Sequence, residues 1–236
     1  GLGIDSFAFS KNINKIIHVE KNEELSAIAE HNFVQLEATK IECISADGIY
    51  FLKNNSQTFD WIYLDPSRRD KNNNKVYYLS DCEPDVNEHL IFLFTKSNNI
   101  LIKTGPLLDL NNGLKHLRNV KEINIVAIGN DVKEVLWLLE KNHSKEPLIK
   151  TINFKNEIKQ TFDFYLNQER SAISTYSIPL AYLYEPNAAI LKSGSFEYVG
   201  RYYNLNKIHS NSHLYTSDKL ISFPGRVFKI LNILDY

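Results

Sequence analysis

The chain has 236 residues, of which 43% are hydrophobic and 23% are charged, so its composition is that of a globular protein. Its formal net charge of −1 excludes a polycation that binds nucleic acid by bulk attraction, although a local basic patch stays open. Its two cysteines, Cys43 and Cys82, form no CxxC pair and its histidines are dispersed, so we expect a reducing, cytoplasmic setting and no metal. No apolar run approaches the roughly 18 residues of a membrane span, and no signal peptide is visible, so no membrane association is expected.

The first part of the chain alternates between two hydrophobic periodicities. Helical spacing predicts helices, and short apolar runs predict strands. Strands alternating with helices predict βαβ units and a doubly wound, Rossmann-like α/β fold with a mostly parallel sheet. The predicted strands span residues 15–20, 41–46, 59–64, 99–103 and 122–128, and the predicted helices span 22–36, 85–96 and 132–141.

The pattern changes near residue 149. Residues 148–154 and 161–166 alternate with period two, which predicts a final antiparallel strand pair. Residues 167–178 are polar and are interpreted as a linker, and a tyrosine-rich stretch follows. We therefore expect two domains, one at 1–170 and a small α+β module at 178–236.

Polar residues stand at the ends of consecutive predicted strands, where open α/β sheets bind ligands. The loop at Gly1 and Gly3 lets backbone N–H groups approach a ligand, Glu20 can accept ribose hydroxyls, and Asp47 can accept from an adenine amine. Glu20 and Asp47 could instead cap the helices that follow them. A dinucleotide oxidoreductase also uses G-x-G, but Ser6 stands where its third glycine is expected.

These motifs resemble those of class I S-adenosylmethionine-dependent methyltransferases, from Gly1 to about Phe154. Gly-Leu-Gly-Ile-Asp resembles the second half of the family's first motif, whose preceding strand we expect to be missing from this fragment. Asp65-Pro66-Ser67-Arg68 takes the place of the Asp-Pro-Pro-Tyr motif of amino methyltransferases. The resemblance implies S-adenosyl-L-methionine as cofactor, bound by Gly1, Gly3, Asp5, Glu20, Lys21, Ala46, Asp47 and Asp65.

A narrower resemblance is to bacterial methyltransferase-like proteins that carry ferredoxin-like and THUMP-like modules. It rests on the Asp-Pro-Ser-Arg-Arg string and on residues 180–192 and 223–229. It implies an RNA substrate, rRNA or tRNA, and a truncated C-terminal module that binds RNA. The implied catalytic residues are Asp65, Pro66, Ser67 and Arg68, and the implied substrate contacts are Arg68, Arg69 and Lys103.

Ser67-Arg68 replaces the part of the Asp-Pro-Pro-Tyr motif that supplies an aromatic ring. Arg68 or Arg69 could stack on a base instead, and Tyr77 or Tyr78 could supply a ring. The same replacement leaves open a non-catalytic RNA-binding or scaffold protein that retains the methyltransferase fold.

Overall fold

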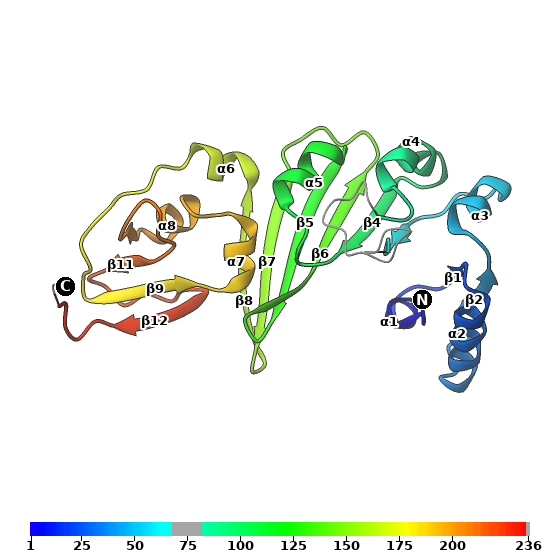
Figure 1. Cartoon of the computed structure of the whole chain (residues 1–236), viewed down its shortest axis with the longest axis horizontal. Coiled ribbons are helices and arrows are strands. Elements are labelled where there is room, and N and C mark those ends of the chain that lie inside the picture. Colours follow the sequence, from blue (N-terminus) through cyan, green and yellow to red (C-terminus); the bar gives the residue numbers. More distant parts are fainter. Residues whose placement is uncertain (68–81, 235–236) are drawn as a thin grey trace. The chain divides into compact units, whose positions relative to one another are not determined.

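The computed structural model describes residues 1–67 and 82–234 and divides into two compact units, Gly1–Thr58 and Phe59–Tyr236 (Figure 1). Each unit has its own secondary structure and is described by itself. This division falls before the third predicted strand, 59–64, whereas the sequence suggested domains at 1–170 and 178–236; that partition stays a prediction.

The first unit contains two parallel strands and three helices. The strands pair from Ile16 opposite Ile41 to Glu20 opposite Ser45. The second helix begins after Asn22, whose side chain accepts a hydrogen bond from the Leu25 N–H at 2.9 Å, which agrees with the helix predicted at 22–36. In chain order the elements are α1 (Ile4–Ser10), β1 (Ile16–Glu20), α2 (Glu23–Gln35), β2 (Ile41–Ser45) and α3 (Gly48–Asn54).

The second unit is built on a six-stranded sheet in the order β3-β4-β6-β5-β7-β8 (Figure 1). Two pairs are parallel, β3 with β4 and β5 with β7, and the other three pairs are antiparallel. The expected antiparallel final pair is confirmed, but this sheet is mixed rather than mostly parallel. Its strands are β3 (Ile62–Leu64), β4 (Asn99–Thr104), β5 (Val120–Ile128), β6 (Asp131–Glu140), β7 (Leu148–Lys155) and β8 (Ile158–Tyr165).

The sheet is mixed because residues 131–140 form β6, a strand that is antiparallel to both its neighbours. The helix predicted at 132–141 is therefore wrong. The apolar run there satisfies either periodicity, and burial follows period two: Val135, Trp137 and Leu139 are fully buried. Gly129 and Asn130 both have positive φ, 61° and 67°, and join β5 directly to β6 as a tight hairpin. The hairpin inserts β6 antiparallel between β4 and β5.

Two helices accompany this sheet, α4 (Val86–Lys96) and α5 (Leu110–His116). Asp85 caps α4 by accepting a hydrogen bond from the Asn87 N–H at 2.9 Å, which agrees with the helix predicted at 85–96. The α4 helix buries Val86, Leu90, Leu93 and Phe94 at helical spacing.

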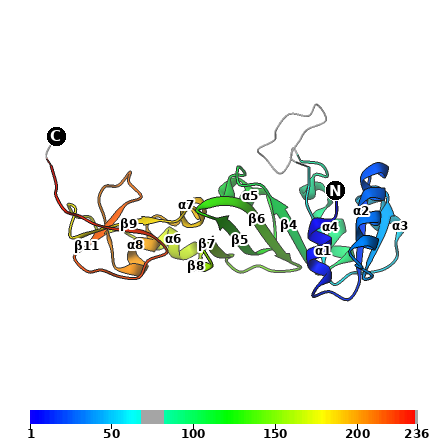
Figure 2. The ribbon, with the colours of Figure 1, turned by 90° about the horizontal axis from the view of Figure 1, so that it is seen from below.

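The C-terminal part of the second unit forms an α+β module, as expected from its sequence. Its four strands are antiparallel in the order β10-β11-β9-β12. The α6 helix lies in the stretch interpreted as a linker, and Figures 1 and 2 both place it next to β8. The elements are α6 (Leu166–Ser171), β9 (Tyr182–Pro186), α7 (Ala188–Ser193), α8 (Tyr198–Tyr203), β10 (Asn206–Lys207), β11 (Tyr215–Ser217) and β12 (Gly225–Lys229).

Trp137 connects α5 to the centre of the six-stranded sheet. Its indole N–H donates to Thr104 Oγ1 at 3.0 Å. A Cβ atom on Gly113 of α5 would lie 2.4 Å from the indole ring, so the helix rests on the ring at a glycine. This contact leaves no room for a side chain at position 113.

We expect Gly113→Ala to lower the free energy of unfolding of the second unit by about 1–3 kcal/mol, because overpacking outweighs the better helix propensity of alanine. Urea unfolding followed by tryptophan fluorescence measures the change. Asn111→Ala, on the exposed side of the same helix, is the matched control and should stay within about 0.5 kcal/mol of the native protein. Equal stability of the two variants would contradict the packing described here.

Candidate functional site

The glycine loop of the first unit adopts a conformation that requires glycine at position 3. Gly3 has φ 75° and ψ 18°, in the left-handed region, and stands directly before α1. A Cβ atom there would lie 2.2 Å from Cζ of Phe33, so α2 is in contact with the backbone of the loop. The Gly3 carbonyl accepts a hydrogen bond from the Phe7 N–H at 2.9 Å and starts the helix.

The loop is held at the carboxyl end of β1. Glu20 is the last residue of β1; its Oε1 accepts from the Asn22 N–H at 2.7 Å, and its Oε2 lies against the backbone nitrogen of Gly1. His18 lies 3.2 Å from the Gly1 carbonyl through Nε2, and 3.1 Å from Ser6 Oγ through Nδ1. Glu20 and the glycine loop are therefore neighbours, as the sequence predicted.

The end of β2 lies level with the end of β1. The Ala46 N–H donates to the Glu20 carbonyl at 3.0 Å, so the predicted pair Ala46–Asp47 begins directly beside Glu20. Asp47 Oδ1 accepts from the Tyr50 N–H at 2.8 Å and caps α3, which confirms the capping interpretation; its contact with an adenine stays a prediction. Next to Ala46 is a surface hollow of about 420 Å³, the Ala46 hollow, lined by Ala46, Tyr50, Phe51, Asn54, Asn55, Ser56 and Gln57.

The second unit brings Asp65 and Lys103 together. Leu64 of β3 pairs with Ile102 of β4 in parallel register, so the next residues, Asp65 and Lys103, stand side by side. Lys103 Nζ lies 2.9 Å from Asp65 Oδ2 and 5.9 Å from the centre of the Tyr63 ring. The Asp65 side chain is 43% exposed and the Lys103 side chain 16%, so the carboxylate faces solvent while the ammonium is mostly covered.

The chain turns away after Asp65. Pro66 is buried, and the Ser67 N–H donates to the Glu83 carbonyl at 2.9 Å, which ties this turn to the segment before α4. Asp5 lies in the first turn of α1, and Lys21 is exposed next to Glu20. The predicted residues Arg68 and Arg69, like the alternatives Tyr77 and Tyr78, lie outside the described residues.

The predicted site residues thus form two groups, one in each unit. Gly1, Gly3, Glu20 and Ala46 gather in the first unit, and Asp65 with Lys103 in the second. Sequence reasoning missed His18 and Ser6, which fix the glycine loop. The one available signal was the place of His18 two residues before Glu20, on the same side of β1.

Within residues 1–67 and 82–234, no three His, Cys, Asp or Glu side chains come close enough together to hold a metal ion. In the same described ranges, no helix combines the length and the apolar composition that crossing a bilayer requires.

Comparison with known proteins finds similarity at two levels. Residues 182–224 match the family described as a ferredoxin-like domain. Over 98% of its length the chain is similar to a crystal structure from Porphyromonas gingivalis W83 described as a "putative methyltransferase", with 36% identity and a TM-score of 0.89. The chain spans 59% of that protein, and none of the curated proteins matches it.

A second solved structure, from work on complex assembly and conformational transition of the type I R-M system, has a TM-score of 0.37 and 14% identity. The match covers 60% of this chain and 34% of the chain in that structure. A likeness this low carries no argument about fold or function.

We expect Gly3→Ala to destabilise the first unit by about 2 kcal/mol, because alanine disfavours the left-handed region and its Cβ meets Phe33. Amide hydrogen exchange at Phe7, whose N–H donates to the Gly3 carbonyl, should become faster. Gly1→Ala is the matched control, since nothing lies within 4 Å of its added Cβ. Unchanged exchange in Gly3→Ala would contradict the described loop.

The loop should also loosen at acid pH. Burial lowers the pKa of His18 below its ordinary value of 6.5, partly offset by its hydrogen bond to Gly1, so the folded unit favours the neutral ring. The resulting stabilisation is complete above pH 6.5 and decreases as the pH falls toward the lower, folded pKa. The protection factor of the Phe7 amide, which corrects for the intrinsic pH dependence of exchange, should fall as the pH decreases from about 6.5 to 5 in the native protein, and much less in His18→Asn. An equal fall of the protection factor in both would show that another group is responsible.

Proposed function

We propose that this chain belongs to an S-adenosylmethionine-dependent methyltransferase that acts on a base in RNA. The observation that carries the proposal is the gathering of the glycine loop, Glu20 and Ala46 at one end of the β1–β2 pair. The 36% identity with the Porphyromonas gingivalis protein described as a "putative methyltransferase" supports the same activity. The RNA target rests on the resemblance of the C-terminal strings and on the ferredoxin-like match.

The residues of the first unit suit the cofactor. Gly3 is buried against Phe33 and sets the left-handed turn of the loop, whereas no atom lies within 4 Å of where a Cβ of the exposed Gly1 would stand, so the backbone at Gly1 is open to close approach by a ligand. Each carboxylate oxygen of Glu20 retains a lone pair beyond its present bond, which a ribose hydroxyl can use. The Ala46 hollow has aromatic and amide walls suited to a purine ring. When bound, the cofactor would supply a methyl group on a positively charged sulfur.

Asp65 is the residue we propose to orient the target amine. Its Oδ2 is paired with Lys103, and the side chain as a whole is 43% exposed. The Pro66 carbonyl is a second acceptor. Such a reaction depends mainly on positioning and exclusion of water, so the role of Lys103 would be to fix the carboxylate. Ser67, Arg68, Arg69 and the exposed Lys21 remain proposed contacts to substrate and cofactor.

A non-catalytic RNA-binding protein is the second candidate. The observation in its favour is at Ser67, which is exposed and whose N–H donates to the Glu83 carbonyl. Residue 67, in the turn after Asp65-Pro66, therefore has no aromatic ring that could stack on a target base. Such a protein would keep the cofactor site and the RNA contacts but transfer no methyl group.

Isothermal titration with S-adenosylmethionine, on the protein with its natural ends, separates the roles of the acids. Asp47→Asn keeps the α3 cap, because asparagine caps as well as aspartate, but removes the charge. We expect it to weaken cofactor binding about tenfold, the cost of one charge-assisted hydrogen bond. Glu20→Gln should do the same.

Methyl incorporation into RNA from cells lacking the protein tests Asp65. Asp65→Asn should reduce incorporation by about 100-fold or more, yet leave cofactor affinity within about twofold. Asp60→Asn, an exposed acid just before β3, is the matched control and should change neither. No cofactor binding by the native protein would contradict the proposal, and cofactor binding without any methyl incorporation would favour the non-catalytic candidate.

A further inference from the structure

A second surface hollow lies between α6 and α8, in the second unit. We propose that this α6–α8 hollow binds a nucleotide of single-stranded RNA by stacking its base on Tyr202 and holding its phosphate with Arg201. The inference rests on the RNA part of the proposed function and names where the strand is held. The hollow measures about 350 Å³ and is lined by Gln168, Ser171, Tyr198, Arg201 and Tyr202.

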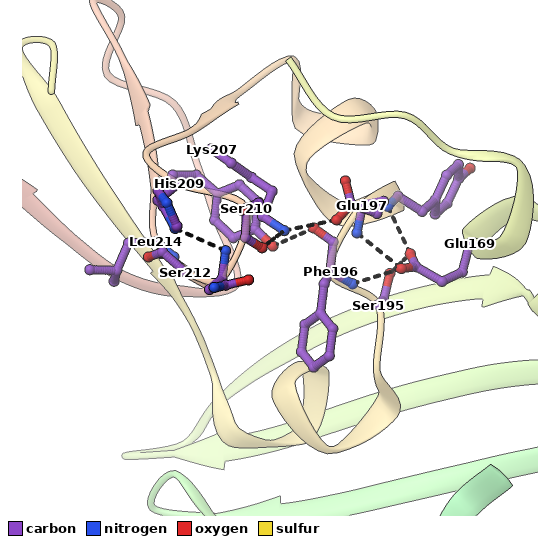
Figure 3. Close-up of polar contacts among 12 residues, drawn as sticks. Glu169, Ser195, Phe196, Glu197, Lys207, His209, Ser210, Ser212 and Leu214 are labelled. Carbon is purple, nitrogen blue, oxygen red and sulfur yellow. Dashed lines mark hydrogen bonds and ion pairs between the residues drawn. The ribbon is translucent and has the colours of Figure 1, made fainter. Parts of the chain in front are cut away.

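The walls of the hollow are fixed by hydrogen bonds. The Glu169 carboxylate accepts from three successive backbone N–H groups, those of Phe196 and Glu197 at 3.0 Å and Tyr198 at 2.7 Å (Figure 3). Gln168 accepts from the Tyr165 N–H at 2.8 Å and donates to the Tyr198 hydroxyl at 2.9 Å. The two helices are therefore locked together before any ligand arrives, which lowers the entropic cost of binding.

Tyr202 is an exposed ring on a rigid support. It meets Phe162 of β8 edge-on, with centroids 5.4 Å apart at 75°, and meets Tyr203 edge-on at 4.9 Å and 74°. Tyr202 nevertheless remains 60% exposed. An aromatic ring that neighbouring rings hold in place and that is open to solvent is a platform on which a base can stack, because every base has a π-face.

The charge of the hollow favours an anion. No carboxylate is among its lining residues, and the charge of Glu169 is directed at backbone N–H groups. Arg201 is exposed and forms no ion pair or side-chain hydrogen bond with any residue in the described parts of the chain. A guanidinium donates a fork of N–H groups that matches a phosphate. Ring and cation together select a ligand that is both aromatic and negatively charged.

The position of the hollow indicates a polymer rather than a free nucleotide. The hollow adjoins β8, whereas Asp65 follows β3, and these strands are the two edges of the six-stranded sheet. Five strand spacings of about 4.8 Å separate them, roughly 24 Å in all. A substrate that reaches Asp65 and also stacks on Tyr202 must be an extended chain of nucleotides.

Fluorescence anisotropy with a labelled oligouridine RNA of about 16 nucleotides, without cofactor, tests the site directly. Tyr202→Ala should weaken binding about tenfold, since a base loses its stacking partner, while Tyr202→Phe should bind within about twofold of the native protein. Arg201→Gln should weaken binding and reduce the dependence of log affinity on log salt by about one phosphate contact.

Two controls probe the same surface chemistry outside the hollow. Tyr176→Ala removes another exposed tyrosine, 55% accessible, and Arg118→Gln removes another exposed arginine; both should bind RNA as the native protein does. Native affinity in Tyr202→Ala, or equal losses in Tyr176→Ala, would overturn the inference. Equally tight binding of the DNA of the same sequence would overturn its restriction to RNA.

The failure of this inference is distinguishable from failure of the proposed function. Every variant should keep native affinity for S-adenosylmethionine by titration. If the protein binds cofactor and transfers methyl groups, but its RNA affinity does not depend on Tyr202 or Arg201, this inference is wrong and the proposed function stands. If RNA binding depends on both residues but the protein binds no cofactor, the proposed methyltransferase function is wrong and this inference is supported.

Discussion

The hydrogen bond from the Trp137 indole to Thr104 is the contact on which the second unit's strand-end geometry depends. Trp137 is fully buried on β6, and Thr104 is the last residue of β4. Lys103 immediately precedes Thr104 and pairs with Asp65. A buried interaction at the centre of the sheet therefore fixes the height at which β4 ends, and so places the exposed carboxylate that follows β3. The parallel register of β3 with β4 then brings Asp65 beside Lys103.

Local sequence signals predicted most of the elements because the physics there is local. Asn22 caps α2 and Asp85 caps α4 through their own side chains, within two or three residues. The prediction failed at β6, since a run such as Val135 to Leu139 is apolar enough for either periodicity. The strand conformation is stabilised by pairing with β5 across the hairpin and with β4, which is distant in the chain.

The candidate site was predictable in position and less so in chemistry. Parallel strands end at one edge, so residues following β1 and β2, or β3 and β4, had to become neighbours. The sequence left open whether those side chains bind a ligand or serve the fold, and the structure shows the second role: Asp47 caps a helix, and Glu20 accepts from the Asn22 N–H. His18 and the α6–α8 hollow depend on contacts between elements distant in sequence, which composition and spacing do not reveal.

The central claim is that the end of the β1–β2 pair in the first unit binds the cofactor. The most direct test is a crystal structure of the protein bound to S-adenosylhomocysteine. The account predicts that the adenosine lies between Glu20 and Asp47, against the Ala46 hollow. A ligand bound elsewhere would contradict it.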